Sequence, residues 1–204
     1  MQEKRTEIMG KIILASASPR RAEILKNSNY VFEILPSPYE EIHSTTVFSY
    51  QYVENLALNK VKAVVPLVNG DCTIIGADTV VVLDDKILEK PKSIQDAKNM
   101  LKSLSSKTHK VVTSIAVADT SAGKTLVKST VSLVTFNILT DEMINFYVDN
   151  FKPLDKAGAY GIQELPAGFV KKYTGSLENI IGICPKALKT LLDELSNGKS
   201  SING

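Results

Sequence analysis

The sequence has no tryptophan, and its 204 residues include only two cysteines and two histidines. Cys72 and Cys184 stand far apart and form no CxxC or metal-type spacing, which favours a reduced, cytoplasmic protein over a disulfide-bonded secreted one. His43 and His109 share no metal-ligand spacing, so nothing specific supports a zinc hydrolase or a Ser-His-Asp triad. No apolar run approaches the ~18 residues of a membrane span, so no membrane partner is expected.

Arginine is also scarce, because only Arg5, Arg20 and Arg21 are found among the 24 basic residues. The 22 acidic residues bring the net charge to +2, which argues against a nucleic-acid binder that neutralises many phosphates. A chain that uses lysine almost everywhere has kept two adjacent arginines at one place. This pair indicates a need for guanidinium geometry there, and not merely for positive charge. Arg5 lies outside every motif described below.

Length and composition fit one globular domain. A chain of 204 residues buries roughly 70% of its unfolded surface, so it needs no metal or disulfide to fold. With 44% hydrophobic and 23% charged residues, it resembles ordinary soluble proteins. We expect a single domain over 11–195, preceded by a flexible extension at 1–10 and followed by a disordered tail at 196–204.

Strand and helix patterns alternate along the chain without an internal repeat, which predicts an α/β (mixed α+β) fold with antiparallel pairs in the second half. Helices are expected to begin after the caps Ser18, Ser93 and Thr140. The pattern predicts helices from 19 onward and at 49–68, 94–104, 140–150 and 185–195, and strands at 11–15, 31–35, 73–75, 79–83, 87–88, 111–118, 126–136 and 169–173.

The turn Ser16-Ala-Ser-Pro-Arg-Arg21 has the features of an anion site. The first amides of a helix lack intrahelical partners and carry the positive end of its dipole. Arg20 and Arg21 add forked donors that match phosphate oxygens, while Ser16 and Ser18 add hydroxyls without bulk. The alternative is an ordinary serine cap followed by two solvated arginines.

Two acidic positions are candidate metal ligands. Asp78 follows Gly76 and Ala77, whose small size would let a ligand approach, and a carboxylate at a strand end can bind Mg²⁺ or orient water. The alternative is that Asp78 caps a turn. Glu41 follows Glu40 in a Pro-flanked loop, where it is either a hard-metal ligand or one of two solvated carboxylates.

Two lysines and one glutamine complete the candidate site. Lys60 falls on the apolar stripe of its predicted helix, so it either extends past the core to solvent or reaches into a pocket that holds a phosphate. Lys90, before Pro91, has the same two interpretations. Gln163 ends the Gly- and Ala-rich run that begins at Lys156; it either reads the edge of a nucleotide base or is exposed on a turn.

Five ordered segments together resemble the Maf family of nucleoside triphosphate pyrophosphatases. The resemblance implies a fold related to inosine triphosphate pyrophosphatases, with an elongated mixed sheet, flanking helices and two lobes around a cleft. It also implies Mg²⁺-dependent hydrolysis between the α and β phosphates, with Mn²⁺ as a second candidate metal, and a homodimer. The segments are Leu14–Arg21, Gly76–Val81, Leu88–Pro91, Asp155–Gln163, and Gly175-Ser with Asn179–Gly182.

The resemblance also implies roles for individual residues. Asp78 corresponds to the family's proton acceptor and Glu41 to its loop acid near the metal, so these two would hold the cation. Lys60 and Lys90 correspond to lysines of the cleft. The positions linked to substrate choice are Arg20, Thr79 and Gln163.

Several segments are similar to the branch of the family that acts on dTTP and UTP, which implies these substrates and modified pyrimidine nucleotides. A 7-methyl-GTP or purine-directed enzyme of the same fold, or a nucleotide sensor linked to cell division, remains the alternative. After Gln163 the chain departs from the family, because Glu164-Leu-Pro-Ala167 stands where a Gly-rich turn is common. Cys184 likewise replaces an aliphatic residue.

Overall fold

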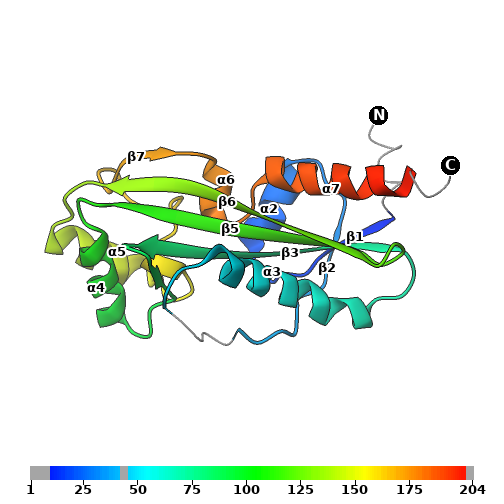
Figure 1. Ribbon diagram of the computed structural model, residues 1–204. Coiled ribbons are helices and arrows are strands. Elements are labelled where there is room, and N and C mark those ends of the chain that lie inside the picture. Colours follow the sequence, from blue (N-terminus) through cyan, green and yellow to red (C-terminus); the bar gives the residue numbers. More distant parts are fainter. Residues whose placement is uncertain (1–9, 42–45, 201–204) are drawn as a thin grey trace.

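One mixed β-sheet of seven strands runs along the molecule in the computed structural model, which describes residues 10–41 and 46–200 (Figure 1). The strands follow the order β2-β1-β3-β5-β6-β7, and β4 pairs with β3 outside this path. β1 is parallel to β2 and β3, whereas all later pairs are antiparallel, as predicted for the second half. The strands are β1 Lys11–Leu14, β2 Glu33–Ile34, β3 Cys72–Leu83, β4 Lys86–Leu88, β5 Thr108–Asp119, β6 Lys124–Phe136 and β7 Val170–Thr174.

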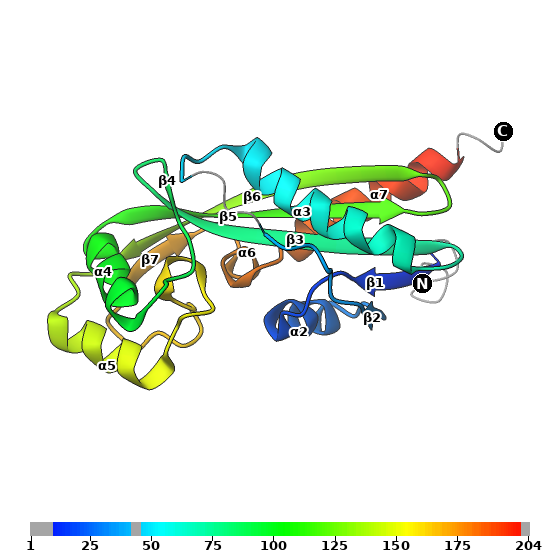
Figure 2. The ribbon, with the colours of Figure 1, turned by 90° about the horizontal axis from the view of Figure 1, so that it is seen from below.

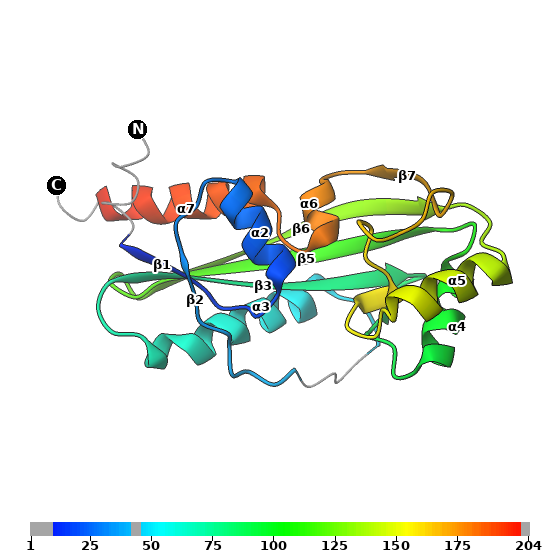
Figure 3. The ribbon, with the colours of Figure 1, turned by 180° about the vertical axis from the view of Figure 1, so that it is seen from behind.

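Helices cover both faces of this sheet, which confirms the predicted fold class. Figures 1 and 2 show α3 against one face, and α4 and α5 together at one end. Figure 3 shows α2 beside α6 and α7, and α2 and α7 share an apolar cluster with β1, β3 and β5 on the opposite face. The helices are α2 Pro19–Asn27, α3 Tyr50–Val64, α4 Ile94–Leu104, α5 Asp141–Phe151, α6 Leu177–Ile181 and α7 Pro185–Ser200, with short 3₁₀ turns η1 Val65–Leu67 and η2 Ala157–Ala159.

The helix starts predicted from sequence are confirmed by their caps. The hydroxyls of Ser18, Ser93 and Thr140 accept hydrogen bonds from the backbone amides of Arg21, Asp96 and Met143, each three residues on. Such a cap satisfies one of the amides that the first turn leaves without a partner. These signals are local, which is why the sequence alone locates them.

The strand β3 differs from the prediction of two strands separated by Gly76-Ala77-Asp78. Cys72–Leu83 is one continuous strand whose pairing with β5 runs without interruption through Asp78, opposite Ser114. The long antiparallel partner supplies hydrogen bonds across the segment that has the composition of a turn. Asp78 therefore lies in the middle of a strand, and neither at a strand end nor in a turn.

Gly76 has a packing role and is not the point of ligand approach that the sequence indicated. A Cβ built on Gly76 would lie 2.7 Å from Val61 Cγ2 and 3.0 Å from the carbonyl oxygen of Ala57, both on α3. The first distance is shorter than real Cβ contacts and the second is tighter than most of them, so glycine at this position lets α3 pack this closely on β3. Close packing here also brings Lys60, the neighbour of Val61, next to the strand.

We expect Gly76→Ala to lower the free energy of unfolding by about 1–3 kcal/mol, because overpacking forces the helix away from the strand. Chemical denaturation of the two proteins measures the difference. The matched control places the same change in a Val61→Ala background, where the crowded methyl group is gone. The cost of Gly76→Ala should be smaller there, and equal costs in both backgrounds would contradict this cause.

Two predicted boundaries need correction. Leu188, Leu191, Leu192 and Leu195 are buried along α7 as predicted, but the helix continues to Ser200, so 196–200 are helical and not a tail. The strand predicted at 31–35 is paired only at Glu33–Ile34. Residues 1–9, 42–45 (with His43) and 201–204 lie outside the described residues. Within the described part of the chain, no helix combines the length and apolar character needed to cross a bilayer.

Candidate active site

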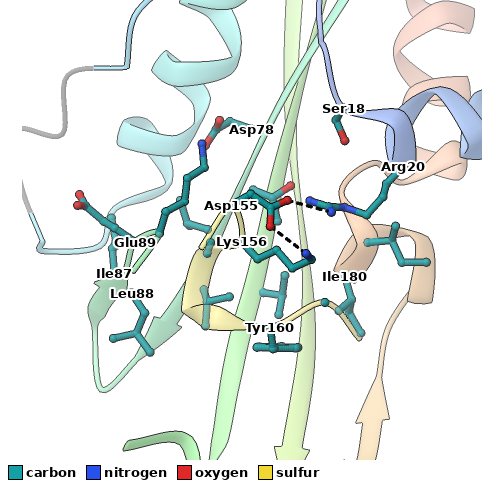
Figure 4. Close-up of a pocket in the computed structure, with 18 of the residues that line it drawn as sticks. Ser18, Arg20, Asp78, Ile87, Leu88, Glu89, Asp155, Lys156, Tyr160 and Ile180 are labelled. Atoms are coloured by element: carbon teal, nitrogen blue, oxygen red, sulfur yellow. Dashed lines mark hydrogen bonds and ion pairs between the residues drawn. The ribbon is translucent and has the colours of Figure 1, made fainter. Parts of the chain in front are cut away.

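A pocket opens at the edge of β3, between β1 and β4 (Figure 4). β1 pairs with β3 as far as Ile75, and β4 pairs with it only from Val81 onward. Among the described residues, this edge of β3 thus has no strand beside it from 76 to 80. Because side chains alternate across a strand, Asp78 and Thr79 reach the pocket from opposite faces of the sheet.

The pocket brings together nearly all of the candidate residues from distant parts of the sequence. Ser16 is the exception, because it does not line the pocket. The remaining candidates all line it: Ser18, Arg20, Arg21, Glu41, Lys60, Asp78, Thr79, Lys90 and Gln163.

A buried lysine joins the two candidate acids. Lys60 Nζ lies 2.6 Å from Glu41 Oε1 and makes a close ion pair with Asp78 Oδ1. The side chains of Lys60 and Asp78 are only 11% and 8% exposed. Removing such charges from water is costly unless they are paired, so the three groups must compensate one another. Lys60 thus lines the pocket, whereas the phosphate that one of its two readings expected there stays a prediction. Lys90 Nζ is more exposed and lies 4.0 Å from Glu41 Oε2.

Tyr52 also lines the pocket and was missed in the sequence. Tyr52, Leu56 and Lys60 follow one another at intervals of four on α3, and all three face the pocket. Residues four apart on a helix share a face, so the position of Tyr52 relative to Leu56 and Lys60 could have predicted that its side chain faces the pocket. Burial and the nearby carboxylates raise the pKa of the Tyr52 hydroxyl, so it remains a hydrogen-bond donor at neutral pH.

Arg21 is held by a fork of hydrogen bonds. Its Nε donates to the carbonyl oxygen of Gly182 at 2.9 Å, Nη1 to Ser16 Oγ at 3.2 Å, and Nη2 to Thr79 Oγ1 at 3.3 Å. Burial lowers the pKa of the Arg21 guanidinium, although the pocket carboxylates oppose this effect. The reading of two solvated arginines is therefore wrong for Arg21. Its fork ties α2, β3 and the end of α6 together at the wall of the pocket.

The two serines of the first turn mainly support its backbone. Ser18 caps α2, and Ser16 Oγ accepts from the Ser18 amide at 3.2 Å as well as from Arg21. Ser16 is buried. Its hydroxyl therefore orients Arg21 from beneath the pocket, which explains why it is absent from the lining.

Arg20 contacts a second group of charges, which consists of Asp155, Lys156 and Glu164. Its Nη1 lies 3.4 Å from Asp155 Oδ2, while Asp155 Oδ1 lies 2.8 Å from Lys156 Nζ (Figure 4). Lys156 Nζ also lies 3.2 Å from Glu164 Oε2. Burial raises the pKa of Asp155, but the hydrogen bond from Lys156 and the charges of Lys156 and Arg20 outweigh it, so the pKa is lowered. Asp155 and Lys156 lie in a segment noted in the sequence, yet only its Gln163 was singled out.

The segment that carries Gln163 is packed tightly against the β3–β4 hairpin. Gly158 has φ +67°, and a Cβ on it would lie 2.9 Å from Val81. Its amide donates to the carbonyl oxygen of Glu89 at 3.1 Å. Gln163 is exposed in a turn and also lines the pocket, and its contact with the edge of a base stays a prediction.

A buried asparagine fixes the end of α6. Asn179 Nδ2 donates to the carbonyl oxygen of Val111 at 3.1 Å and to Ser132 Oγ at 3.0 Å, and the Asn179 carbonyl oxygen accepts from Thr113 Oγ1 at 2.8 Å. The two side-chain bonds and the bond to the Asn179 backbone carbonyl hold α6 on β5 and β6. The backbone carbonyl of Gly182 then points to Arg21. The fifth sequence segment therefore positions the site without lining it with polar side chains.

We assign His109 no role in the chemistry of the pocket. Its Nε2 lies 2.7 Å from the hydroxyl of Tyr160, whose ring lines the pocket. Burial lowers the pKa of His109 to about 4 and raises that of Tyr160, so both side chains are neutral at pH 7. The pair supports the apolar part of the pocket wall.

Residues 11–195 match the family model described as "Maf-like protein". Three curated relatives carry the name "dTTP/UTP pyrophosphatase". The relative from Alkaliphilus metalliredigens is 43% identical over 175 residues, covering 86% of this chain and 91% of that protein. The relative from Clostridium botulinum strain Alaska E43 is 42% identical over 187 residues, covering 90% and 98%. The relative from Escherichia coli K12 is 43% identical over 175 residues, covering 86% and 88%.

Solved structures that are similar to this chain share less of its sequence. A Mycobacterium abscessus protein described as "Nucleoside-triphosphatase / dITP/XTP pyrophosphatase" is 15% identical with a TM-score of 0.45, covering 94% of this chain and 97% of that one. A HAM1 protein from Coxiella burnetii is 14% identical with a TM-score of 0.45, covering 94% and 98%.

Proposed function

The chain belongs to the Maf family, and on that premise we propose that it hydrolyses dTTP and UTP between the α and β phosphates to give a nucleoside monophosphate and pyrophosphate. The enzyme is thus a hydrolase of phosphoric anhydrides, and modified pyrimidine nucleotides are further candidate substrates. The single observation that carries the proposal is the buried cluster of Lys60 with Asp78 and Glu41 in a pocket also lined by Arg20 and Lys90. Acids beside several cations suit a polyanionic substrate that reacts with water.

A divalent cation fits the two acids. Asp78 and Glu41 both contact the single ammonium of Lys60, so their oxygens converge on one position. Mg²⁺ takes hard oxygen ligands and is usually held by one or two carboxylates together with substrate phosphates. Among the described residues, no group of three acidic, His or Cys side chains could hold a metal alone. Asp78 and Glu41 would therefore hold Mg²⁺ or Mn²⁺ only together with the nucleotide, where the cation neutralises phosphoryl charge.

The chain's own residues supply the remaining chemistry. We assign Asp78 as the base that takes a proton from the attacking water. The water oxygen forms a bond to the α-phosphorus, and the bond from that phosphorus to the bridging oxygen breaks. Arg20 and Lys90, which are less buried than Lys60, bind the pyrophosphate that leaves. Lys60 keeps both carboxylates oriented and balances their charge, and Arg21 holds Thr79 in place.

A panel of nucleotides with identified products tests this proposal. We expect UTP and dTTP to be converted to the monophosphate and pyrophosphate in Mg²⁺, and chelation of the metal to abolish the reaction. Chromatography of the products distinguishes this cleavage from release of inorganic phosphate. Preferred hydrolysis of 7-methyl-GTP or a purine triphosphate would favour the rival enzyme. Nucleotide binding without pyrophosphate release in Mg²⁺ or Mn²⁺ would favour the sensor linked to cell division.

Location and assembly are further parts of the proposal. Both cysteines are unpaired and buried, which is compatible with the cytoplasmic setting that we propose. The homodimer rests on the family resemblance alone. Light scattering coupled to size-exclusion chromatography measures the mass in solution directly, and the mass of a single chain would overturn the dimer.

A further inference from the structure

Lys156 is the pocket cation to which neither the sequence nor the mechanism above gives a role. It lies in the wall formed by the segment that ends at Gln163, and its side chain is only 9% exposed. Figure 4 shows Lys156 on the side of the pocket where Tyr160 and Ile180 lie, away from Asp78. One end of the pocket thus carries Asp78 and Glu41, and the other combines apolar side chains with the buried ammonium of Lys156 and the carboxylates that pair with it.

The position of this ammonium is fixed by its surroundings. Asp155 Oδ1 and Glu164 Oε2 lie 2.8 Å and 3.2 Å from Lys156 Nζ. The stem of Lys156 packs on Gly161, where an added Cβ would lie 3.0 Å from Lys156 Cε. A side chain held in this way loses little conformational freedom when a ligand binds.

The bonding capacity of the ammonium indicates what it would bind. A lysine carries three N–H donors, and Asp155 Oδ1 accepts one of them. Glu164 Oε2, 3.2 Å from Lys156 Nζ, contributes charge without accepting a hydrogen bond. The negative charges of Asp155 and Glu164 offset the positive charge of Lys156, so its ammonium attracts a phosphate group only weakly. A donor that Asp155 does not take suits a neutral acceptor such as a carbonyl oxygen.

Uracil and thymine present such an acceptor, because both carry a carbonyl group at C4. Cytosine carries an amino group there, which an ammonium cannot use as a hydrogen-bond acceptor. Apolar side chains such as Ile180, together with the ring of Tyr160, suit the faces of a planar base. A phosphate chain that reaches the acids at the other end would leave the base in this part of the pocket.

We propose that Lys156 donates a hydrogen bond to the C4 carbonyl of the bound pyrimidine and thereby selects uracil and thymine nucleotides over cytosine nucleotides. This inference rests on the proposed function, since it assigns the base subsite of the same pocket. Glu164 belongs to the stretch where the chain departs from the family pattern, and here it supplies the second carboxylate of this lysine.

The test compares kcat/KM for UTP and CTP in the wild type, in Lys156→Met and in Lys98→Met. We expect Lys156→Met to lower kcat/KM for UTP roughly 10- to 100-fold, the value of one hydrogen bond from a charged donor, and to leave CTP hydrolysis nearly unchanged. The ratio of kcat/KM for UTP to kcat/KM for CTP therefore falls by the same factor. Lys98 is ion-paired with Asp149 away from the pocket and provides the same substitution as a control, whose ratio stays at the wild-type value.

An equal loss for UTP and CTP in Lys156→Met would show a merely structural ion pair and overturn the inference. Where Lys156→Met fails to fold, the wild type with 4-thio-UTP and 2-thio-UTP decides the question, because sulfur is a weaker acceptor than oxygen. A loss confined to 4-thio-UTP supports the contact, and equal rates for both analogues overturn it. Absence of UTP and dTTP hydrolysis in the wild type would remove the proposed function itself, whereas hydrolysis with an unchanged ratio in Lys156→Met removes only this inference.

Discussion

Asp78→Asn should lower kcat by on the order of a thousandfold while changing nucleotide binding little, because the amide cannot take the proton of the attacking water. The substitution keeps the size of the side chain and its place in the middle of β3. In Asp78→Asn the ammonium of Lys60 still pairs with the carboxylate of Glu41, so the substitution does not leave the buried lysine without a partner. Turnover of UTP at saturating Mg²⁺, measured beside nucleotide binding by calorimetry, separates the chemical step from affinity.

The matched control for this change is Asp85→Asn. Asp85 lies in the β3–β4 turn with φ +59°, a conformation that asparagine tolerates, and its side chain is 82% exposed. Asp85→Asn removes the same charge outside the pocket and should keep wild-type turnover. Wild-type turnover of Asp78→Asn at saturating Mg²⁺ would show that Asp78 is not the base.

The local features of the fold could be predicted from the sequence, and the long-range ones could not. A serine cap such as Ser93 depends on residues within one helical turn, so its reading was correct. The continuity of β3 through Gly76 depends on β5, where the partner of Gly76 is the distant residue Ala116. No local pattern distinguishes a glycine that makes room for a helix from one that breaks a strand.

The candidate site likewise has local features that the sequence predicts and long-range features that it does not. Residue types suited to phosphate and metal chemistry could be found one by one, as with Glu41 and Lys60, because their chemistry belongs to the side chain. Their pairing belongs to the fold, since Lys60 lies 18 positions from Asp78 along the chain. Lys156 escaped notice because its importance comes from burial and from Glu164, and neither can be read from the motif.

Arg21→Lys should lower both stability and activity, although it preserves the charge. A lysine ammonium is a compact point donor and cannot reach Gly182, Ser16 and Thr79 together as the planar guanidinium does. The three acceptors keep other partners, since Ser16 Oγ accepts from the Ser18 amide and Thr79 Oγ1 pairs with Thr113 Oγ1 and with the Gly182 carbonyl. What is lost is the contribution of hydrogen bonds from a charged donor, about 1.5–3 kcal/mol each, so the loss of two contacts predicts a fall of about 2–4 kcal/mol in the free energy of unfolding. Chemical denaturation measures this quantity directly.

Arg20→Lys is the comparison that isolates the fork. Arg20 is adjacent in sequence and undergoes the same chemical change, but its side chain is 31% exposed and has one carboxylate partner at 3.4 Å. An exposed ion pair of this kind contributes at most about 1 kcal/mol, so Arg20→Lys should leave stability nearly unchanged. Catalysis should fall in both variants for different reasons, because Arg20 faces the substrate whereas Arg21 holds Thr79 and the end of α6. If the two variants are equally stable, a positive charge alone is sufficient at position 21. Guanidinium geometry would then not explain why this lysine-rich chain has two adjacent arginines.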